Sequence, residues 1–268
     1  MIDRGRFNVL GIGVSAVDYD AAVARIVTAA KAGEPMGISA LAVHGVMTGV
    51  LDREHCYRLN QLEMIVPDGQ PVRWALNWLH RAQLKDRVYG PNLTLRVCEA
   101  AAENDLPIFL FGSSAEVLDK LSDKLCEKFP KLRIAGKLPS KFRRLSESER
   151  DDLAKQIIDS GARITMVGIG CPRQEIWAYE LKRTLSMPVL AVGAAFAFHS
   201  GELAQAPQWM QDRGLEWFYR LTREPLRLWK RYALLNPTYA ALIGLQALRL
   251  MTLTQARGRE PKEEQRYG

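Results

Sequence analysis

An aspartate follows a short apolar run in the segment Val66-Pro67-Asp68-Gly69-Gln70. We expect residues 64–66 to form a strand and a helix to begin near Pro71, which places Asp68 in the turn between them. A carboxylate in such a turn can take a proton from a hydroxyl group and so act as a general base. It can also cap the helix that follows, and the spacing alone favours this second role.

A second turn that could do chemistry is Val167-Gly168-Ile169-Gly170-Cys171-Pro172-Arg173-Gln174-Glu175. Its glycines allow the backbone to approach a ligand closely. Pro172 stands where a helix would begin, and the N-terminus of a helix attracts phosphate. Arg173 and Gln174 could add contacts to a phosphate and to an amide. The alternative is a plain turn with an exposed arginine, and the residues favour neither interpretation.

The elements that position these turns alternate between strand-like and helix-like runs as far as Val192. This alternation predicts an α/β fold, a Rossmann-like and mostly parallel sheet with helices on both faces. Ligands of such sheets bind at the carboxyl ends of the strands, where both turns and the small-residue run 192–201 would meet. Expected strands are 7–10, 37–43, 64–66, 107–111, 132–135, 163–167 and 189–192, and one of the expected helices is 44–59.

The segment 214–232 interleaves cations with large apolar side chains. At helical spacing the cations fall on one arc and most of the apolar residues on another, and Pro225 divides the segment into two helices. A basic amphipathic surface of this kind favours contact with anionic lipid or phosphate. The alternative is that the aromatic residues belong to the core and the arginines to a solvated face.

The charge distribution indicates that the partner of this chain meets this segment, and we expect that partner to be a membrane surface and not a nucleic acid. Of the formal net charge of +7, residues 207–268 carry +5, with 11 Lys and Arg against 6 Asp and Glu. The longest uncharged run, 232–248, is shorter than the ~20 residues that a spanning helix needs, so we expect a packed or interfacial helix. We expect no signal peptide, a reducing compartment for the four scattered cysteines, and no metal site.

Two further motifs are interpreted as structural. Gly11-Ile12-Gly13-Val14-Ser15-Ala16 matches the dinucleotide fingerprint, which keeps an NAD(P)-dependent oxidoreductase as an alternative. The acidic residue expected about 20 positions later is missing, so an ordinary turn is favoured. Asp18-Tyr19-Asp20 resembles a metal-holding Asp-x-Asp, but it stands at a helix start, where Asp serves as a cap.

Taken in order, four blocks resemble the WecG/TagA/CpsF glycosyltransferases, glycosyltransferase family 26. They are Pro67-Asp68-Gly69, Arg87-Val-Tyr-Gly-Pro-Asn-Leu93, Gly168-Ile-Gly-Cys-Pro-Arg-Gln-Glu175, and Ala206-Pro-Gln-Trp209 leading into Gly214-Leu-Glu-Trp-Phe-Tyr-Arg220. The resemblance covers most of the chain. It implies a nucleotide-sugar-binding catalytic core at 1–203, and we expect a basic helical appendage at 204–254 and a flexible polar tail at 255–268.

This family resemblance implies an inverting transfer of a sugar from a UDP-sugar to a polyprenyl-pyrophosphate-linked saccharide. It implies no metal or other cofactor. The enzyme would be peripheral at the cytoplasmic face of a bacterial membrane, in exopolysaccharide, capsule or other cell-surface glycan synthesis. Whether the chain forms a homo-oligomer stays open.

The resemblance also assigns residues. Asp68 matches the proposed general base. The candidates for binding the substrates are His44, Arg87, Gly90, Asn92, Gly112, Gly168, Gly170, Arg173 and Gln174. The candidates for contact with lipid and pyrophosphate are Arg220, Arg223, Arg227 and Arg231.

Three positions depart from the family pattern. Many members carry Thr-x-Asn where this chain has Ala42-Val43-His44, so His44 either replaces the Asn near the donor or is a packed histidine. Asn92 stands in place of an Asp and keeps a hydrogen-bonding group without its charge. Ala197 stands in place of another Asp and removes a polar group, which keeps a non-catalytic membrane-associated scaffold as a second alternative.

Overall fold

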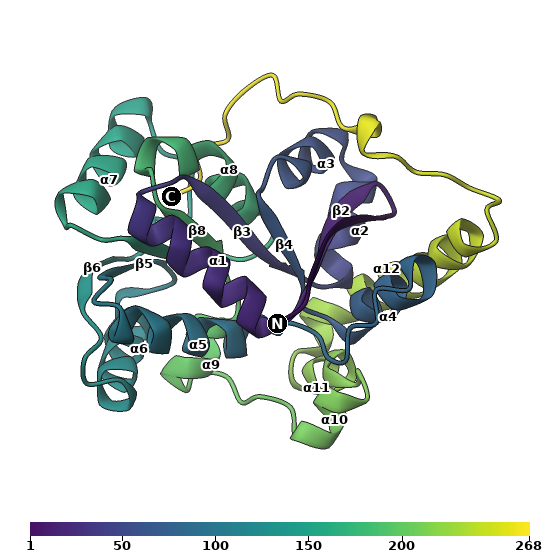
Figure 1. Cartoon of the computed structure of the whole chain (residues 1–268), viewed down its shortest axis with the longest axis horizontal. Helices are drawn as coiled ribbons and strands as arrows, with labels where there is room; N and C mark the ends of the chain where they lie inside the picture. Colours follow the sequence, from purple (N-terminus) through teal and green to yellow (C-terminus); the bar gives the residue numbers. More distant parts are fainter.

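A computed structural model describes residues 1–268, apart from the side chains of Arg227 and Arg231. Its centre is a parallel six-stranded sheet in the order β4-β3-β8-β7-β5-β6, with helices on both faces (Figure 1). The predicted Rossmann-like α/β class is therefore confirmed. The strands of this sheet are β3 (Met36–Leu41), β4 (Met64–Pro67), β5 (Ile108–Gly112), β6 (Ile134–Leu138), β7 (Ile164–Gly168) and β8 (Pro188–Ala191).

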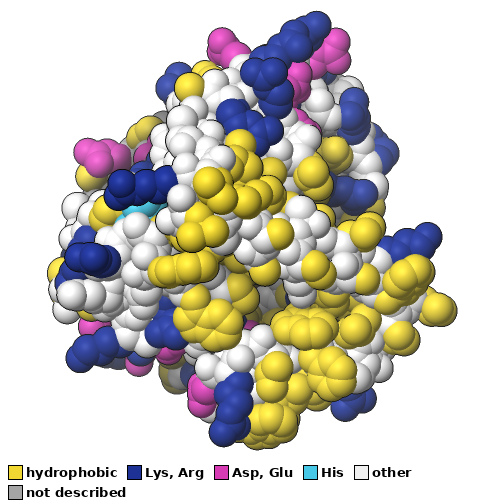
Figure 2. All heavy atoms as spheres, turned by 90° about the vertical axis from the view of Figure 1, so that its right-hand side faces the viewer, with side chains coloured by type: hydrophobic (Ala, Val, Ile, Leu, Met, Phe, Trp, Pro, Cys, Tyr) yellow, Lys and Arg dark blue, Asp and Glu magenta, His cyan; other side chains and the backbone are white. Residues whose placement is uncertain are grey.

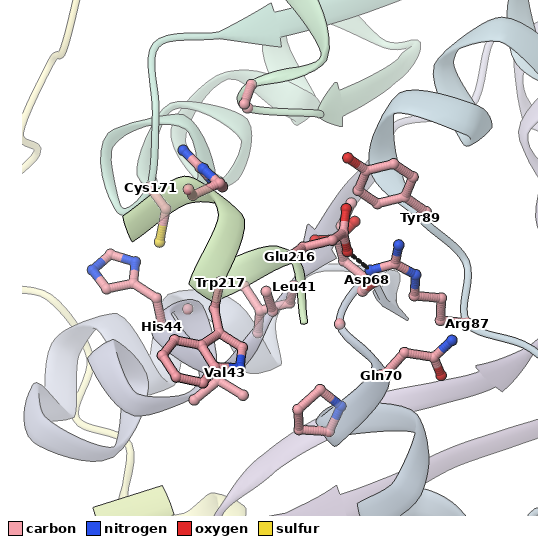
Figure 3. Close-up of a pocket in the computed structure, with 18 of the residues that line it drawn as sticks. Leu41, Val43, His44, Asp68, Gln70, Arg87, Tyr89, Cys171, Glu216 and Trp217 are labelled. Atoms are coloured by element: carbon pink, nitrogen blue, oxygen red, sulfur yellow. Dashed lines mark hydrogen bonds and ion pairs between the residues drawn. The ribbon is translucent and has the colours of Figure 1, made fainter. Parts of the chain in front are cut away.

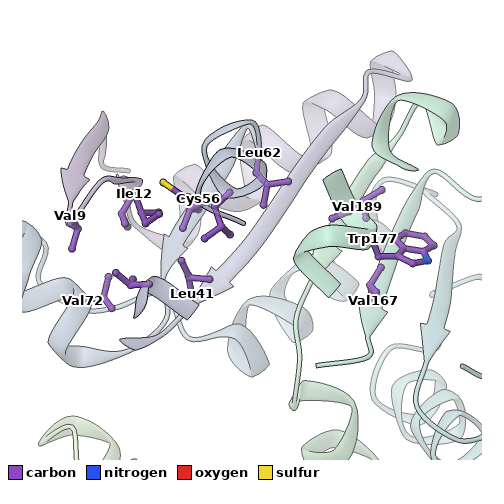
Figure 4. Packing of buried hydrophobic residues seen from close by; sticks show 14 of the residues in the cluster. Val9, Ile12, Leu41, Cys56, Leu62, Val72, Val167, Trp177 and Val189 are labelled. Atoms are coloured by element: carbon purple, nitrogen blue, oxygen red, sulfur yellow. The ribbon is translucent and has the colours of Figure 1, made fainter. Parts of the chain in front are cut away.

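Two hydrophobic clusters cover the two faces of the sheet because side chains alternate along the strands. On β5, Ile108 and Leu110 belong to one cluster and Phe109 and Phe111 to the other. The first cluster includes α1 (Tyr19–Ala32), α5 (Gly90–Glu103), α6 (Ala115–Lys128) and α9 (Ala195–Ser200). The second, partly drawn in Figure 4, includes α2 (Val43–Leu51), α3 (Arg53–Asn60), α4 (Gln70–His80), α7 (Glu147–Asp159) and α8 (Arg173–Leu185).

The sheet has a switch point between its neighbouring strands β3 and β8. The helix after β3, α2, packs on one face, whereas the helix after β8, α9, packs on the other. The segments that follow β3 and β8 therefore diverge where the strands end, and such a point opens a crevice at the carboxyl edge of the sheet.

The first expected strand is one arm of an antiparallel hairpin, β1 (Asp3–Val9) and β2 (Ile12–Val17). Gly11 lies in the turn of this hairpin, with φ +87° and its N–H donating to Asn8 Oδ1 at 2.7 Å. The motif therefore does not join a strand to a helix, and its interpretation as an ordinary turn is confirmed. Asp18 caps α1 by accepting from Ala21 N at 2.9 Å, as predicted.

The expected helix 44–59 is divided into α2 and α3 at Asp52. Asp52 has an extended backbone, and its side chain accepts hydrogen bonds from Glu54 N and His55 N. This cap satisfies the first N–H groups of α3 and allows the chain to change direction there.

The carboxyl-terminal helices α10 (Gln208–Asp212), α11 (Glu216–Arg223) and α12 (Pro225–Ala247) follow the core. The predicted division at Glu224-Pro225 is confirmed, since Pro225 is the first residue of α12. α12 packs against α2 and α4, and the Gln246 side chain bonds to Leu10 N and Asn8 O. No helix among the described residues combines the length and apolar character needed to cross a bilayer.

The sequence predicts a flexible tail at 255–268, and in the structure this segment runs from beyond α12 back toward α7 and α8 (yellow in Figure 1). It contains a 3-10 helix at Gln255–Arg257. Glu180 accepts from the backbone N–H groups of Gln265 and Arg266, and Ser140 Oγ donates to Gly268 O at 2.6 Å. Side chains contact the core as well, since Arg150 forms an ion pair with Glu264.

Candidate active site

A cavity of about 830 Å³ lies at the carboxyl edge of the sheet. Its lining comes from the residues that follow β3, β4, β5, β7 and β8, and from α4, α9, α11 and α12 (Figure 3). The crevice at the switch point is therefore enclosed by the carboxyl-terminal helices. A volume of this size is typical of small-molecule sites.

Asp68 lines this cavity directly after β4. Its backbone N–H donates to Leu41 O at 3.2 Å, and its Oδ1 accepts from Gly90 N at 2.6 Å. Gly90 is the first residue of α5, so the carboxylate lies at the N-terminus of that helix. The cap residue of α4 is Gly69, without a side-chain hydrogen bond, so Asp68 does not cap α4 as its spacing favoured.

The pKa of the Asp68 carboxyl is raised to about 6, chiefly because burial penalises the charged form. The Arg87 guanidinium and the Gly90 N–H oppose this rise, whereas the charge of Glu216 adds to it. A carboxylate with a pKa near neutrality is matched to general-base chemistry at physiological pH.

Arg87 connects the core to α11. It forms an ion pair with Glu216, it donates to Asp68 O at 3.2 Å, and its guanidinium lies 4.2 Å from the centre of the Tyr89 ring. The Tyr89 side chain bonds to Glu216 as well, and burial raises the pKa of its hydroxyl. Figure 3 shows Asp68, Arg87, Tyr89 and Glu216 together on one side of the cavity.

The opposite side of the cavity contains the glycine-rich turn after β7. Gly168, Gly170 and Gln174 line the cavity there, at the N-terminal end of α8. Gln174 Nε2 donates to Glu175 Oε1 at 2.9 Å, and Gln174 Oε1 is buried without a hydrogen-bond partner. Burial raises the pKa of Glu175, which also accepts from Ser39 Oγ. This side offers polar groups and close backbone approach to a ligand.

His44 also lines the cavity, at the start of α2, and lies near Cys171 in Figure 3. Gly112 has φ +120°, and a Cβ placed on it would come within 2.7 Å of the Gly168 backbone. Gly112 therefore keeps β5 and β7 close together where they end. Ala197 lines the cavity at α9.

The remaining candidate residues differ in whether they line the cavity. Arg220 lines the cavity, whereas Arg223 is exposed beside the Tyr219 ring. Asn92 and Arg173 are exposed and do not line the cavity. The Asn92 side chain forms a hydrogen bond with Tyr19, and the Arg173 guanidinium lies over the Tyr267 ring. The side chains of Arg227 and Arg231 lie outside the described part of the chain.

Several residues that line the cavity are not among the candidates that the sequence predicts. Glu216, Trp217 and Tyr239 come from the carboxyl-terminal helices, and Trp74 and Trp78 from α4. The Gly214–Arg220 block contained Glu216, but nothing in the sequence indicates that its partner is Arg87, 129 positions away. Among the residues that the structure describes, no group of three or more His, Cys, Asp or Glu side chains is placed to hold a metal ion.

The sequence of this chain is similar to those of known proteins. Residues 7–252 match the profile of the Glycosyl transferase WecG/TagA/CpsF family. The chain belongs to this family. A relative in Bacillus subtilis (strain 168), named N-acetylglucosaminyldiphosphoundecaprenol N-acetyl-beta-D-mannosaminyltransferase, is 30% identical over 195 residues, which cover 72% of this chain and 73% of the relative. This WecG/TagA/CpsF protein is accordingly a glycosyltransferase.

Proposed function

We propose that this glycosyltransferase moves a sugar from a UDP-sugar to a saccharide carried on polyprenyl pyrophosphate. The step would serve exopolysaccharide, capsule or other cell-surface glycan synthesis. The name of the Bacillus subtilis relative describes an acceptor of this class. The observation that carries the proposal is Asp68, whose pKa is raised to about 6, in the wall of a cavity of about 830 Å³.

Asp68 acts as the general base in this proposal. The acceptor hydroxyl oxygen forms a bond to the anomeric carbon of the donor sugar, and Asp68 takes the proton of that hydroxyl. The bond from the anomeric carbon to the phosphate oxygen breaks, and UDP leaves with the electron pair. Attack from the face opposite UDP inverts the anomeric centre. The hydrogen bond from Gly90 N to Oδ1 keeps the carboxylate in one orientation.

The donor occupies the side of the cavity formed by the turn after β7. Gly168 and Gly170 allow the backbone to approach the pyrophosphate, and the N-terminal end of α8 favours its charge. Gln174 and His44 are then the candidates for hydrogen bonds to the donor. Arg220 lines the cavity from α11 and is the candidate for the acceptor pyrophosphate, since arginine binds phosphate with paired hydrogen bonds.

The acceptor lipid requires the enzyme to work at a membrane, and we infer a peripheral association at the cytoplasmic face. Exposed side chains on α11 and α12 support this: Phe218, Leu226, Trp229 and Leu234 are apolar, and Arg223 is charged. Apolar insertion together with cation attraction is the usual basis of interfacial binding.

The reaction class is tested by UDP release from a panel of UDP-sugars, each with and without a polyprenyl-pyrophosphate-linked saccharide. The proposal predicts that one donor releases UDP only when an acceptor is present, and this result would name the donor. A panel that includes N-acetylglucosaminyl-diphospho-undecaprenol and gives no acceptor-dependent release with any donor would contradict it.

A further inference from the structure

The cavity extends beyond Asp68 into a region bounded by α4 and α12, which we call the apolar arm. Pro71, Trp74 and Trp78 of α4 line it on one side, and Tyr239, Ala240 and Ile243 of α12 on the other. Sugar hydroxyls and phosphates need polar partners, and these two groups of residues offer mainly hydrocarbon and ring surface.

The apolar arm has a buried floor and an open rim. Tyr239 and Ile243 are each 5% exposed, whereas Trp74 is 45% and Trp78 63% exposed. Tyr239 Oη donates to Pro71 O at 3.2 Å, which ties α12 to the start of α4 below the arm. The arm is therefore a fixed groove that opens outward.

The outer face around the arm is rich in hydrophobic side chains. Figure 2 shows them gathered around a hollow on the side of the molecule that carries α4, α11 and α12. Leu234 on α12 and Leu248 just after it are both well exposed. A hydrocarbon chain that leaves the arm therefore meets more apolar surface.

Charged side chains line the same cavity as the arm. Asp68 and Arg220 both line it, Arg220 near enough to Asp68 to lower its pKa, and the arm lies between α4 and α12. A second hollow beyond Trp78 is lined by Arg81 and Arg249. One cavity thus offers a base, a cation and an apolar groove, which are the partners that the hydroxyl, the diphosphate and the hydrocarbon of a lipid-linked acceptor need, and the outer cations suit an anionic lipid surface.

We propose that the apolar arm binds the first isoprene units of the acceptor lipid, next to its pyrophosphate. This inference rests on the proposed function for its substrate class. The arm then selects acceptors by their hydrocarbon and holds the saccharide end near Asp68, so that the chain is recognised inside the enzyme as well as by the bilayer.

Binding of diphosphates to the full-length protein, measured by calorimetry without membranes or nucleotide, tests this inference. Wild type should bind farnesyl diphosphate at least about tenfold more tightly than methyl diphosphate, since burial of two methylene groups already gives that factor. Trp78→Ala should lose most of this preference, and Ala240→Trp should remove it by filling the arm. Trp229→Ala and Ala241→Trp are the matched controls, because both positions are exposed and do not line the cavity. These two variants should keep the preference for farnesyl diphosphate.

Equal binding of the two diphosphates by wild type would overturn the inference, as would a preference that survives both arm variants. Loss of transfer in Trp78→Ala without any change in chain preference would assign the tryptophan to the saccharide and also overturn it. The proposed function is judged separately. Transfer that ignores chain length keeps that function and removes the arm, whereas Trp78-dependent prenyl binding without transfer keeps the arm and removes that function.

Discussion

At the residue scale, the environment of Asp68 gives its carboxyl the properties of a base. Burial raises its pKa to about 6, while Arg87 keeps it from rising further. The active form is the carboxylate, so kcat/KM should increase as pH rises through about 6 and level off above that value. A pH profile with no acidic limb in the range pH 5–7 would contradict the assignment.

The two charged neighbours of Asp68 should shift this profile in opposite directions. Arg87→Gln removes the charge that lowers the pKa of Asp68, so the acidic limb should move to higher pH. The comparison requires the pH dependence of kcat/KM for the variant and wild type, because a merely structural defect lowers the rate without moving the limb.

Glu216→Gln should move the acidic limb to lower pH, since the charge of Glu216 raises the pKa of Asp68. The amide can still accept a hydrogen bond from Arg87, so the contact between α11 and the core is retained in part. The pH profile of Glu216→Ala should shift the same way with a greater loss of rate. A shift to higher pH in either variant would refute this role for Glu216.

The sequence singled out Asp68 because it stands in a turn after a buried strand, and the family resemblance gave it the role of base. Its pairing with Gly90 and the ion pair of Arg87 with Glu216 were not predictable, since both partners are brought together by the fold. Local spacing favoured a helix cap for Asp68, and this was wrong because the carboxylate turns toward α5 and not toward α4.

At the element scale, the strand order brings the turns after β5 and β7 together. Gly112→Ala should destabilise the protein by about 1–3 kcal/mol, because its φ of +120° strains any Cβ and that atom would meet the Gly168 backbone. Gly244→Ala is the control, since a Cβ there meets no other group and Ala favours a helix. Urea unfolding of the three proteins gives the comparison, and equal stability of Gly112→Ala and wild type would contradict this packing.

The alternation of strands and helices was predictable because hydrophobic periodicity is local. The hairpin of β1 and β2 was not, since Gly11 and Gly13 were compatible with a strand-to-helix turn as well as a hairpin turn. Tyr239 and Pro71 are 168 positions apart, so the closure of the cavity by α12 has no signal in the sequence.

At the scale of the whole molecule, positive charge and exposed aromatic residues gather on the carboxyl-terminal helices. Replacing Arg213, Arg223 and Lys230, which are exposed on or at the end of these helices, with Ala should weaken binding to anionic liposomes by about 100-fold, since each charge near the surface contributes about 1 kcal/mol. Lys128, Lys131 and Lys155, replaced together, remove the same charge from the region of α6 and α7 and should leave binding unchanged. Equal sedimentation of both triple variants with liposomes would contradict membrane binding through the carboxyl-terminal helices.

The central claim, that Asp68 is the base of a sugar transfer, is tested most directly by the transfer rate of Asp68→Asn with saturating substrates. Asp20→Asn, which changes an exposed aspartate on α1, is the control. The account predicts a loss of 10²- to 10⁴-fold, roughly the usual contribution of a general base, for Asp68→Asn alone. Wild-type rates in Asp68→Asn would show that another group takes the proton.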